Sequence, residues 1–170
     1  TAEEAFKHIP EIDSETIFTT QWYEHLNTLD ADETLNNTAW ECIFEVRQLV
    51  LKALEDAREQ GLIGSGLEAS VDIYCGPETQ KVLALLEQEL RFVLITSDAN
   101  VHALEDSADA TRFDLSNQEQ IALTINKSSH QKCARCWHLR PDVGDHEQHP
   151  ELCGRCVDNI DGDGETRRYA

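Results

Sequence analysis

The sequence contains no methionine, few basic residues and no long hydrophobic run. Its 170 residues include 14 lysines and arginines against 33 aspartates and glutamates, a formal net charge of −19. Lysine and arginine make the phosphate contacts of nucleic-acid binding, so the overall charge argues against a chain that binds nucleic acid over its whole surface. We find no signal peptide and no apolar run long enough to cross a membrane, and therefore expect a cytoplasmic protein. Because the chain starts at Thr1 without methionine, we expect it to be a fragment of a longer polypeptide.

The basic residues that are present gather near the carboxyl end. Residues 1–126 hold 7 basic and 25 acidic side chains, whereas residues 127–170 hold 7 basic and 8 acidic ones. Half of the positive charge thus lies in the last quarter of the chain, on Lys127, Lys132, Arg135, Arg140, Arg155, Arg167 and Arg168. A nucleic-acid contact, if there is one, is expected in this quarter.

Four cysteines in this quarter form two C-x-x-C pairs. Cys133 and Cys136 make the first pair, and after sixteen intervening residues Cys153 and Cys156 make the second. Two intervening residues let one tight turn present both sulfurs of a pair to one ion, and two such turns complete a tetrahedral zinc site. Disulfides and a redox C-x-x-C pair are weaker alternatives, because a chain without a signal peptide keeps its thiols reduced. Four thiolates also suit iron, but zinc is the metal we predict.

The other candidate metal ligands are predicted to have no such role. Cys42 and Cys75 lack partners at ligand spacing, and we interpret them as small buried hydrophobic residues. The histidines His138, His146 and His149 are interpreted as surface residues, because four thiolates leave no coordination position for them.

Residues 1–30 are predicted to be irregular with short helical pieces, and a long helix is predicted after them. Phe18, Trp22, Tyr23 and Leu26 have a spacing that predicts one apolar stripe packed at an edge of the core. From 32 to 60, apolar residues recur every three or four positions, which predicts a long amphipathic helix capped by Asp30 or Asp32 and ended by Gly61. Its apolar face is wide, so we expect it to pack against more than one neighbour.

Residues 63–127 are predicted to form a small α/β layer. Alternation over 69–75 predicts a strand, Pro77 opens a helix over 78–89, and the apolar run 92–96 predicts a buried strand. These elements form a βαβ unit with parallel strands. Residues 105–119 are interpreted as a surface excursion, and alternation over 121–125 predicts a last strand. The expected fold is α+β or small α/β: an amphipathic helix, a βαβ-containing sheet, and a four-cysteine zinc knuckle in residues 128–170.

Trp137 and Gly154 are the notable residues beside the cysteines. Gly154 is predicted to let the backbone fold tightly over the metal, where a side chain would be crowded. Trp137 directly follows a ligand, and either covers the metal as a miniature core or, with Arg135, forms a platform on which an unpaired base stacks. Likewise Lys132, Arg135 and Arg155 either offset the charge of the thiolates or contact RNA. The residues alone leave both choices open.

Several stretches resemble one enzyme family. They are C-A-R-C-W-H from Cys133, D-V-G from Asp142, H-P-E-L-C-G-R-C ending at Cys156 and D-G-D-G-E-T-R-R-Y-A at the end of the chain. Upstream, V-R at Val46, K-A-L-E-D-A-R from Lys52, I-G-S-G-L-E-A from Ile63 and E-L-R-F-V-L-I-T-S from Glu89 extend the resemblance. Together they resemble the carboxyl-terminal region of bacterial isoleucyl-tRNA synthetases.

The resemblance implies a parent enzyme that uses ATP to join isoleucine to its tRNA, with this chain at the anticodon-binding end. The HIGH and KMSKS motifs of such ligases are absent here, so no aminoacylation site is expected, and ATP would bind only elsewhere in the parent. The resemblance implies a monomer with one structural zinc ion, and residues 1–62 as the end of a helical anticodon-binding region. Its implied tRNA contacts are Arg135, Trp137, Arg140, Arg155, Arg167 and Arg168, with Arg135 and Trp137 facing splayed anticodon-loop bases.

Two other functions fit the cysteine pairs. One is a zinc ribbon that docks only to protein, in which case the arginines would lie in a protein interface. The other is the finger that closes the formamidopyrimidine-DNA glycosylases, although the sequence before Cys133 predicts an α/β layer rather than a glycosylase body. An independent redox enzyme is the weakest alternative.

Overall fold

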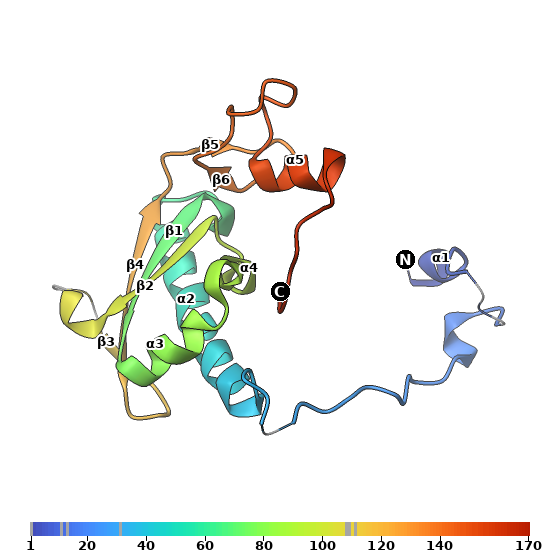
Figure 1. The fold of residues 1–170 in the computed structure, drawn as a ribbon. Coiled ribbons are helices and arrows are strands. Elements are labelled where there is room, and N and C mark those ends of the chain that lie inside the picture. Colours follow the sequence, from blue (N-terminus) through green and yellow to red (C-terminus); the bar gives the residue numbers. More distant parts are fainter. Residues whose placement is uncertain (1, 11, 13, 31, 108–109, 111) are drawn as a thin grey trace. The chain divides into compact units, whose positions relative to one another are not determined.

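A computed structural model describes residues 2–10, 12, 14–30, 32–107, 110 and 112–170 (Figure 1). Backbone contacts divide the chain into two compact units, residues 1–30 and 31–170. The division into 1–62, 63–127 and 128–170 that the sequence predicts remains a prediction. Within the described residues, no helix combines the length and the apolar character that crossing a bilayer requires.

The first unit has little regular structure. It contains α1 (Ala2–Phe6) and the short 3-10 helix η1 (Ile17–Thr19), whose first N–H groups are capped by Thr16. Residues 20–30 form neither helix nor strand. The predicted apolar stripe is therefore wrong for this chain: Phe18, Trp22, Tyr23 and Leu26 are 67–95% exposed. Without a helix, the four side chains have no common face on which to pack.

The second unit begins with the long amphipathic helix α2 (Asn37–Glu59). The side chain of Asn36 caps it by accepting a hydrogen bond from the N–H of Ala39 at 3.1 Å. The predicted caps Asp30 and Asp32 are wrong, because the apolar repeat does not show where the first helical N–H groups find an acceptor. The predicted end is confirmed at Gly61, which has a φ of +74° and so reverses the chain in a conformation that favours glycine.

A four-stranded sheet follows, with β1 (Ala69–Cys75) at its centre. The strand order is β2-β1-β4-β3, with β2 (Asp98–Ala103) parallel to β1 and β4 (Gln120–Lys127) antiparallel to it. The edge strand β3 (Arg112–Asp114) pairs with β4. The predicted strands at 69–75 and 121–125 are confirmed. A parallel βαβ connection is also present, but its second strand is β2 and not the predicted run 92–96. The segment 105–119, predicted to be a surface excursion, contains the end of the 3-10 helix η4 (Leu104–Asp106) and the strand β3. Its residues 108, 109 and 111 lie outside the described part of the chain.

The crossover between β1 and β2 differs from the prediction. It consists of α3 (Pro77–Ala84), a 3-10 turn η3 (Glu87–Glu89) and α4 (Leu90–Leu94). The predicted strand over 92–96 is wrong: the apolar run forms a helical turn with Leu90 and Leu94 buried, and Ile95, at a φ of +58°, ends it. A short apolar run fits a buried strand or a buried helical turn equally well. Length and tertiary packing decided between them.

The helices cover one face of the sheet. Helix α2 contacts both α3 and α4, and every second residue of β1 is fully buried. One core therefore joins α2 to the sheet, through Ile43, Val46 and Val50 on the helix and Val71 and Ile73 on β1. The wide apolar face predicted for α2 is used in this core, although Phe44 remains 52% exposed.

The cysteines follow the sheet in residues 131–161, which we call the cysteine module. It contains β5 (Gln131–Lys132) paired with β6 (Leu139–Arg140), and α5 (Gly154–Asp161), close to one end of the large sheet (Figure 1). Ser97 fixes the module to the body: its side-chain oxygen accepts the N–H of Leu139 at 2.6 Å, and its carbonyl accepts Arg140 Nη1 at 3.2 Å.

The last residues return to the body as a tail (residues 162–170). The carboxylate of Glu89 accepts the backbone N–H groups of Arg168, Tyr169 and Ala170 at 2.6, 2.6 and 2.8 Å. The ring of Tyr169 packs against the main core. The module is thus held between two contacts with the α/β body, one at Ser97 and one at Glu89.

Candidate metal centre

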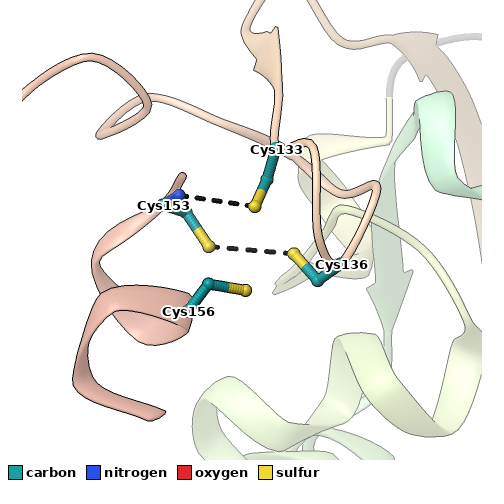
Figure 2. A group of neighbouring side chains, drawn as sticks. All are labelled: Cys133, Cys136, Cys153 and Cys156. Atoms are coloured by element: carbon teal, nitrogen blue, oxygen red, sulfur yellow. Dashed lines mark hydrogen bonds between the residues drawn. The ribbon is translucent and has the colours of Figure 1, made fainter. Parts of the chain in front are cut away.

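Four cysteine side chains converge in the cysteine module. The sulfur atoms of Cys133, Cys136, Cys153 and Cys156 all lie within 4.8 Å of one another (Figure 2). The Sγ atoms of Cys136 and Cys153 are 3.7 Å apart. A tetrahedron with zinc–sulfur bonds of about 2.3 Å has sulfur–sulfur edges of about 3.8 Å. The sulfurs are thus already close to the spacing that one tetrahedral ion requires.

Local backbone turns bring each pair together. In the first pair, the N–H of Trp137 donates to the backbone carbonyl of Cys133 at 3.0 Å, and the N–H of Cys133 donates to the backbone carbonyl of His138 at 2.9 Å. In the second, Cys153 is the N-cap of α5 and Cys156 lies in its first turn, with an N–H to carbonyl distance of 2.9 Å between them. Neither turn needs a long-range contact, which explains why the spacing alone predicted the cluster.

The environment of the sulfurs favours thiolate at one position and thiol at others. Burial raises the pKa of Cys133, but the N–H groups of Cys136, Cys153 and Arg135 outweigh it and lower that pKa to about 6. Burial raises the pKa of Cys153 to about 12, and that of Cys156 above its usual value. Four thiolates this close are therefore stable only with a cation among them.

Two arginines contact the sulfurs. Arg135 Nη1 lies 3.7 Å from Cys156 Sγ. Burial would lower the pKa of Arg155, but hydrogen bonding to Cys136 and the charge of Glu165, whose Oε1 lies 2.8 Å from Arg155 Nη1, raise it. Arg135 and Arg155 are placed as charge partners of a metal thiolate cluster. Lys132 is not, because it lies over the ring of Trp137 at 5.1 Å.

Gly154 lies where a side chain would collide. Its N–H donates to Asp142 Oδ2 at 2.8 Å, so it connects the loop between the cysteine pairs to the start of α5. A Cβ atom at this position would lie 3.0 Å from the same oxygen and 3.3 Å from His146 Nε2. A side chain at Gly154 would therefore be crowded, but by Asp142 and His146, and tight folding over the metal stays a prediction.

Trp137 is exposed rather than buried over the cluster. Its φ of +66° is in the left-handed region, which a bulky residue rarely adopts. Its exposure is 59%, and the cysteines pack instead against Val143 and Leu152. Of the two roles predicted for the ring, a cover over the metal does not fit this placement.

The remaining predicted contact residues lie in different surroundings. Arg135 and Arg168 are exposed. Arg140 and Arg155 are partly buried and bonded to Ser97 and Glu165. Arg167 donates to Glu165 at 3.0 Å and lies 4.1 Å from the centre of the Phe92 ring.

The sequence predictions missed a cluster around Phe92. The guanidinium carbons of Arg91, Arg155 and Arg167 lie 4.7, 5.1 and 4.1 Å from the ring centre. The ring of His138 packs against it edge-on at 5.7 Å. No local pattern links residues so far apart in the chain.

The remaining histidines and cysteines lie outside the four-sulfur cluster. His138 is half-buried, so its prediction as a surface residue is wrong; burial and the neighbouring arginines lower its pKa to about 4. His149 pairs with Asp161 at 2.6 Å. Burial raises the pKa of Cys75 to about 12, and that of the half-buried Cys42 above its usual value, so both remain thiols as small apolar residues do.

Comparison with known proteins agrees with this geometry. Residues 131–159 match the family described as "Zinc finger found in FPG and IleRS". Over 171 aligned positions covering 100% of this chain, it is 45% identical to isoleucine–tRNA ligase of Alkalilimnicola ehrlichii, 47% to that of Psychromonas ingrahamii and 46% to that of Pseudomonas aeruginosa. The alignment covers 18% of each of these relatives. The chain is therefore, over its whole length, a homologue of isoleucine–tRNA ligases, and it spans about a fifth of their length.

Proposed function

We propose that the four cysteines hold one structural zinc ion and that the cysteine module binds the anticodon end of tRNA. The chain is then the carboxyl-terminal region of an enzyme that joins isoleucine to its tRNA. The fit to zinc comes from the donor set, since four thiolates at tetrahedral spacing are typical of closed structural sites. Zinc would supply a rigid clamp and no reaction chemistry.

The placement of Trp137 carries the proposal for RNA. Its backbone is fixed by the hydrogen bond to Cys133, directly beside the metal, while its ring is 59% exposed. Arg135 is exposed on the same turn. A rigid, exposed aromatic ring on a turn with basic side chains is a surface on which unpaired bases can stack, worth about 1–3 kcal/mol per base.

The charge distribution is consistent with this location. Residues 1–126 are strongly acidic, whereas residues 127–170 are nearly neutral. RNA would therefore approach the module and tail rather than the acidic body. Arg140, Arg155 and Arg167 are bonded to Ser97 or Glu165, so in this proposal they shape the surface. Arg135 and Arg168 contact Cys156 Sγ and the Tyr169 ring but are exposed, and with Trp137 they would reach the RNA.

The remaining parts of the proposal concern the longer enzyme. ATP and isoleucine would bind outside this chain, which lacks the HIGH and KMSKS motifs. The partners would be the tRNA for isoleucine and the rest of the synthetase, in a cytoplasmic monomer. The 18% coverage of the relatives supports a missing catalytic portion.

The test uses Trp137→Ala in the full-length synthetase. Loss of one stacked base is expected to lower kcat/KM for tRNA by about tenfold or more, while isoleucine-dependent pyrophosphate exchange stays unchanged. Trp137→Phe keeps a ring for stacking and is the matched control, with most of the tRNA activity retained. If both reactions fall together in Trp137→Ala, or if neither does, the proposal is wrong.

A further inference from the structure

One of the four clustered cysteines is partly exposed, and the other three are buried. Cys133, Cys153 and Cys156 are 0–1% exposed, whereas Cys136 is not fully covered. Two of the buried sulfurs also have other contacts. The N–H of Cys153 donates to Cys133 Sγ at 3.4 Å, and Arg135 Nη1 lies 3.7 Å from Cys156 Sγ. A small reagent that reaches the cluster from outside therefore meets Cys136 first.

A cavity of about 290 Å³ lies beside the exposed cysteine. Of the four clustered cysteines, its lining holds Cys136 and Cys153, which belong to different C-x-x-C pairs. Gln88, in the 3-10 turn η3, lines it from the α/β body. A water molecule occupies about 30 Å³ in the liquid, so the cavity has room for a reagent as small as hydrogen peroxide. Such a reagent would have access to one sulfur of each pair.

The sulfurs of Cys136 and Cys153 face each other in the cluster (Figure 2). Their Sγ atoms are 3.7 Å apart, and a disulfide bond measures about 2.05 Å, so only a short approach separates them from a bond. Arg155 also lines the cavity and hydrogen-bonds Cys136. Its positive charge would stabilise a hydroxide that leaves during oxidation of this sulfur.

We propose that Cys136 and Cys153 form a peroxide-sensitive pair through which oxidation releases the metal. The inference rests on the proposed function, in which four thiolates hold zinc and keep Trp137 on a rigid turn. The C-x-x-C pattern by itself would favour a disulfide within each pair, as in redox C-x-x-C motifs. The structure points instead to a bond between the pairs, because the cavity gives access to one sulfur of each.

The reaction consumes one hydrogen peroxide per chain. The Cys136 thiolate attacks one peroxide oxygen, the O–O bond breaks, hydroxide leaves, and Cys136 becomes a sulfenic acid. The Cys153 thiolate then attacks the Cys136 sulfur, forms the disulfide and displaces a second hydroxide. Two electrons have passed from the two sulfurs to the peroxide. Cys133 and Cys156 keep their thiolates, but two ligands do not complete a tetrahedral site.

The test is treatment of the zinc-loaded chain with hydrogen peroxide. A chromogenic chelator follows the released zinc, and peptide mass spectrometry maps the disulfides. We expect zinc release to accompany a peptide pair joined through Cys136 and Cys153. A thiol reductant with added zinc should then restore the bound metal, because disulfide formation is reversible.

The decisive variant is Gln88→Trp, which narrows the cavity without changing a ligand. Peroxide should release its zinc severalfold more slowly, because access limits the oxidation of a thiolate. Gln148→Trp is the matched control, since Gln148 is an exposed residue of the module outside the cavity lining; its rate should equal that of the unchanged chain. If Gln88→Trp binds less zinc before treatment, Gln88→Ala replaces it, and its wider opening should speed the release.

Three results would overturn the proposal: disulfides within the C-x-x-C pairs, equal rates of zinc release in the Gln88 variant and the unchanged chain, or earlier oxidation of Cys42. Cys42 is also partly exposed, so its earlier reaction would show that exposure alone decides. The proposed function is tested separately. A chain that holds no zinc before treatment refutes the metal site itself, whereas a zinc-loaded chain that oxidises elsewhere refutes only the Cys136–Cys153 pair.

Discussion

Removal of the metal is expected to unfold the cysteine module and leave the α/β body folded. The module has its own small core, in which only Val143 and Leu152 join the four cysteines. Burying two such side chains contributes about 1.5–3 kcal/mol each. Ordering the backbone costs about 1–2 kcal/mol per residue, which two apolar side chains offset for only a few residues. Zinc binding supplies about 10–16 kcal/mol to modules of this kind.

The body has a separate and much larger core. Buried residues of α2 and the sheet form it without any of the four clustered cysteines. Chelation therefore removes the main stabilisation of residues 131–161, but takes few contacts from β1 or α2. We expect two independent responses rather than one cooperative loss.

Hydrogen exchange measured by NMR separates the two responses. After chelation, the amides of Trp137 and Cys156, which donate to Cys133 and Cys153, should lose their protection. The amides of Val71 and Ile73, in the central strand, should keep theirs. Cys153→Ser should behave like the chelated chain, whereas Cys42→Ser, which removes a thiol outside the cluster, should retain the metal and its protection.

Either of two exchange patterns would contradict this expectation. If Trp137 and Cys156 stay protected without metal, the contacts at Ser97 and Glu89 hold the module by themselves. If Val71 and Ile73 lose protection together with the module, the two parts form one cooperative unit.

Three further predictions concern single positions. Partial burial raises the pKa of Glu89, but three tail N–H groups outweigh it and lower that pKa; the tail is therefore held above about pH 4.3 and released as the pH falls through the folded-state pKa. Glu89→Gln should release it at neutral pH, seen as about tenfold faster amide exchange at Tyr169, and unchanged exchange would contradict this. Trp137→Gly should leave the zinc-loaded module as stable or up to about 1 kcal/mol more stable in thermal melts, because glycine adopts positive φ freely; a clear loss would show that the ring packs. Gly154→Ala should cost about 1–3 kcal/mol through the contact with Asp142, measured as faster metal loss to a competing chelator, and metal retention equal to that of the unchanged chain would refute it.

The sequence predicted the elements whose signal is local. These signals are the apolar repeat in α2, the alternating apolar residues in β1 and β4, and the two-residue spacing within each cysteine pair. Each of them can be read within a short stretch of sequence. The exceptions show the limit of such patterns. The apolar run 92–96 was predicted to be a strand but lies in the end of α4 and the turn after it. Asn36 rather than an aspartate caps α2.

The sequence by itself therefore determined the two cysteine pairs and the strands at 69–75 and 121–125, because the spacing within a pair and the alternation along a strand are local. It did not determine which strand pairs with β1 in parallel, since that is β2 at Asp98–Ala103. Only the tertiary structure decided which side chains surround the metal module. It brought Phe92 from the crossover against Arg155 of the module and Arg167 of the tail. Such contacts join residues far apart in the chain, and depend on how α4, the module and the tail pack together, which no periodicity in the sequence records.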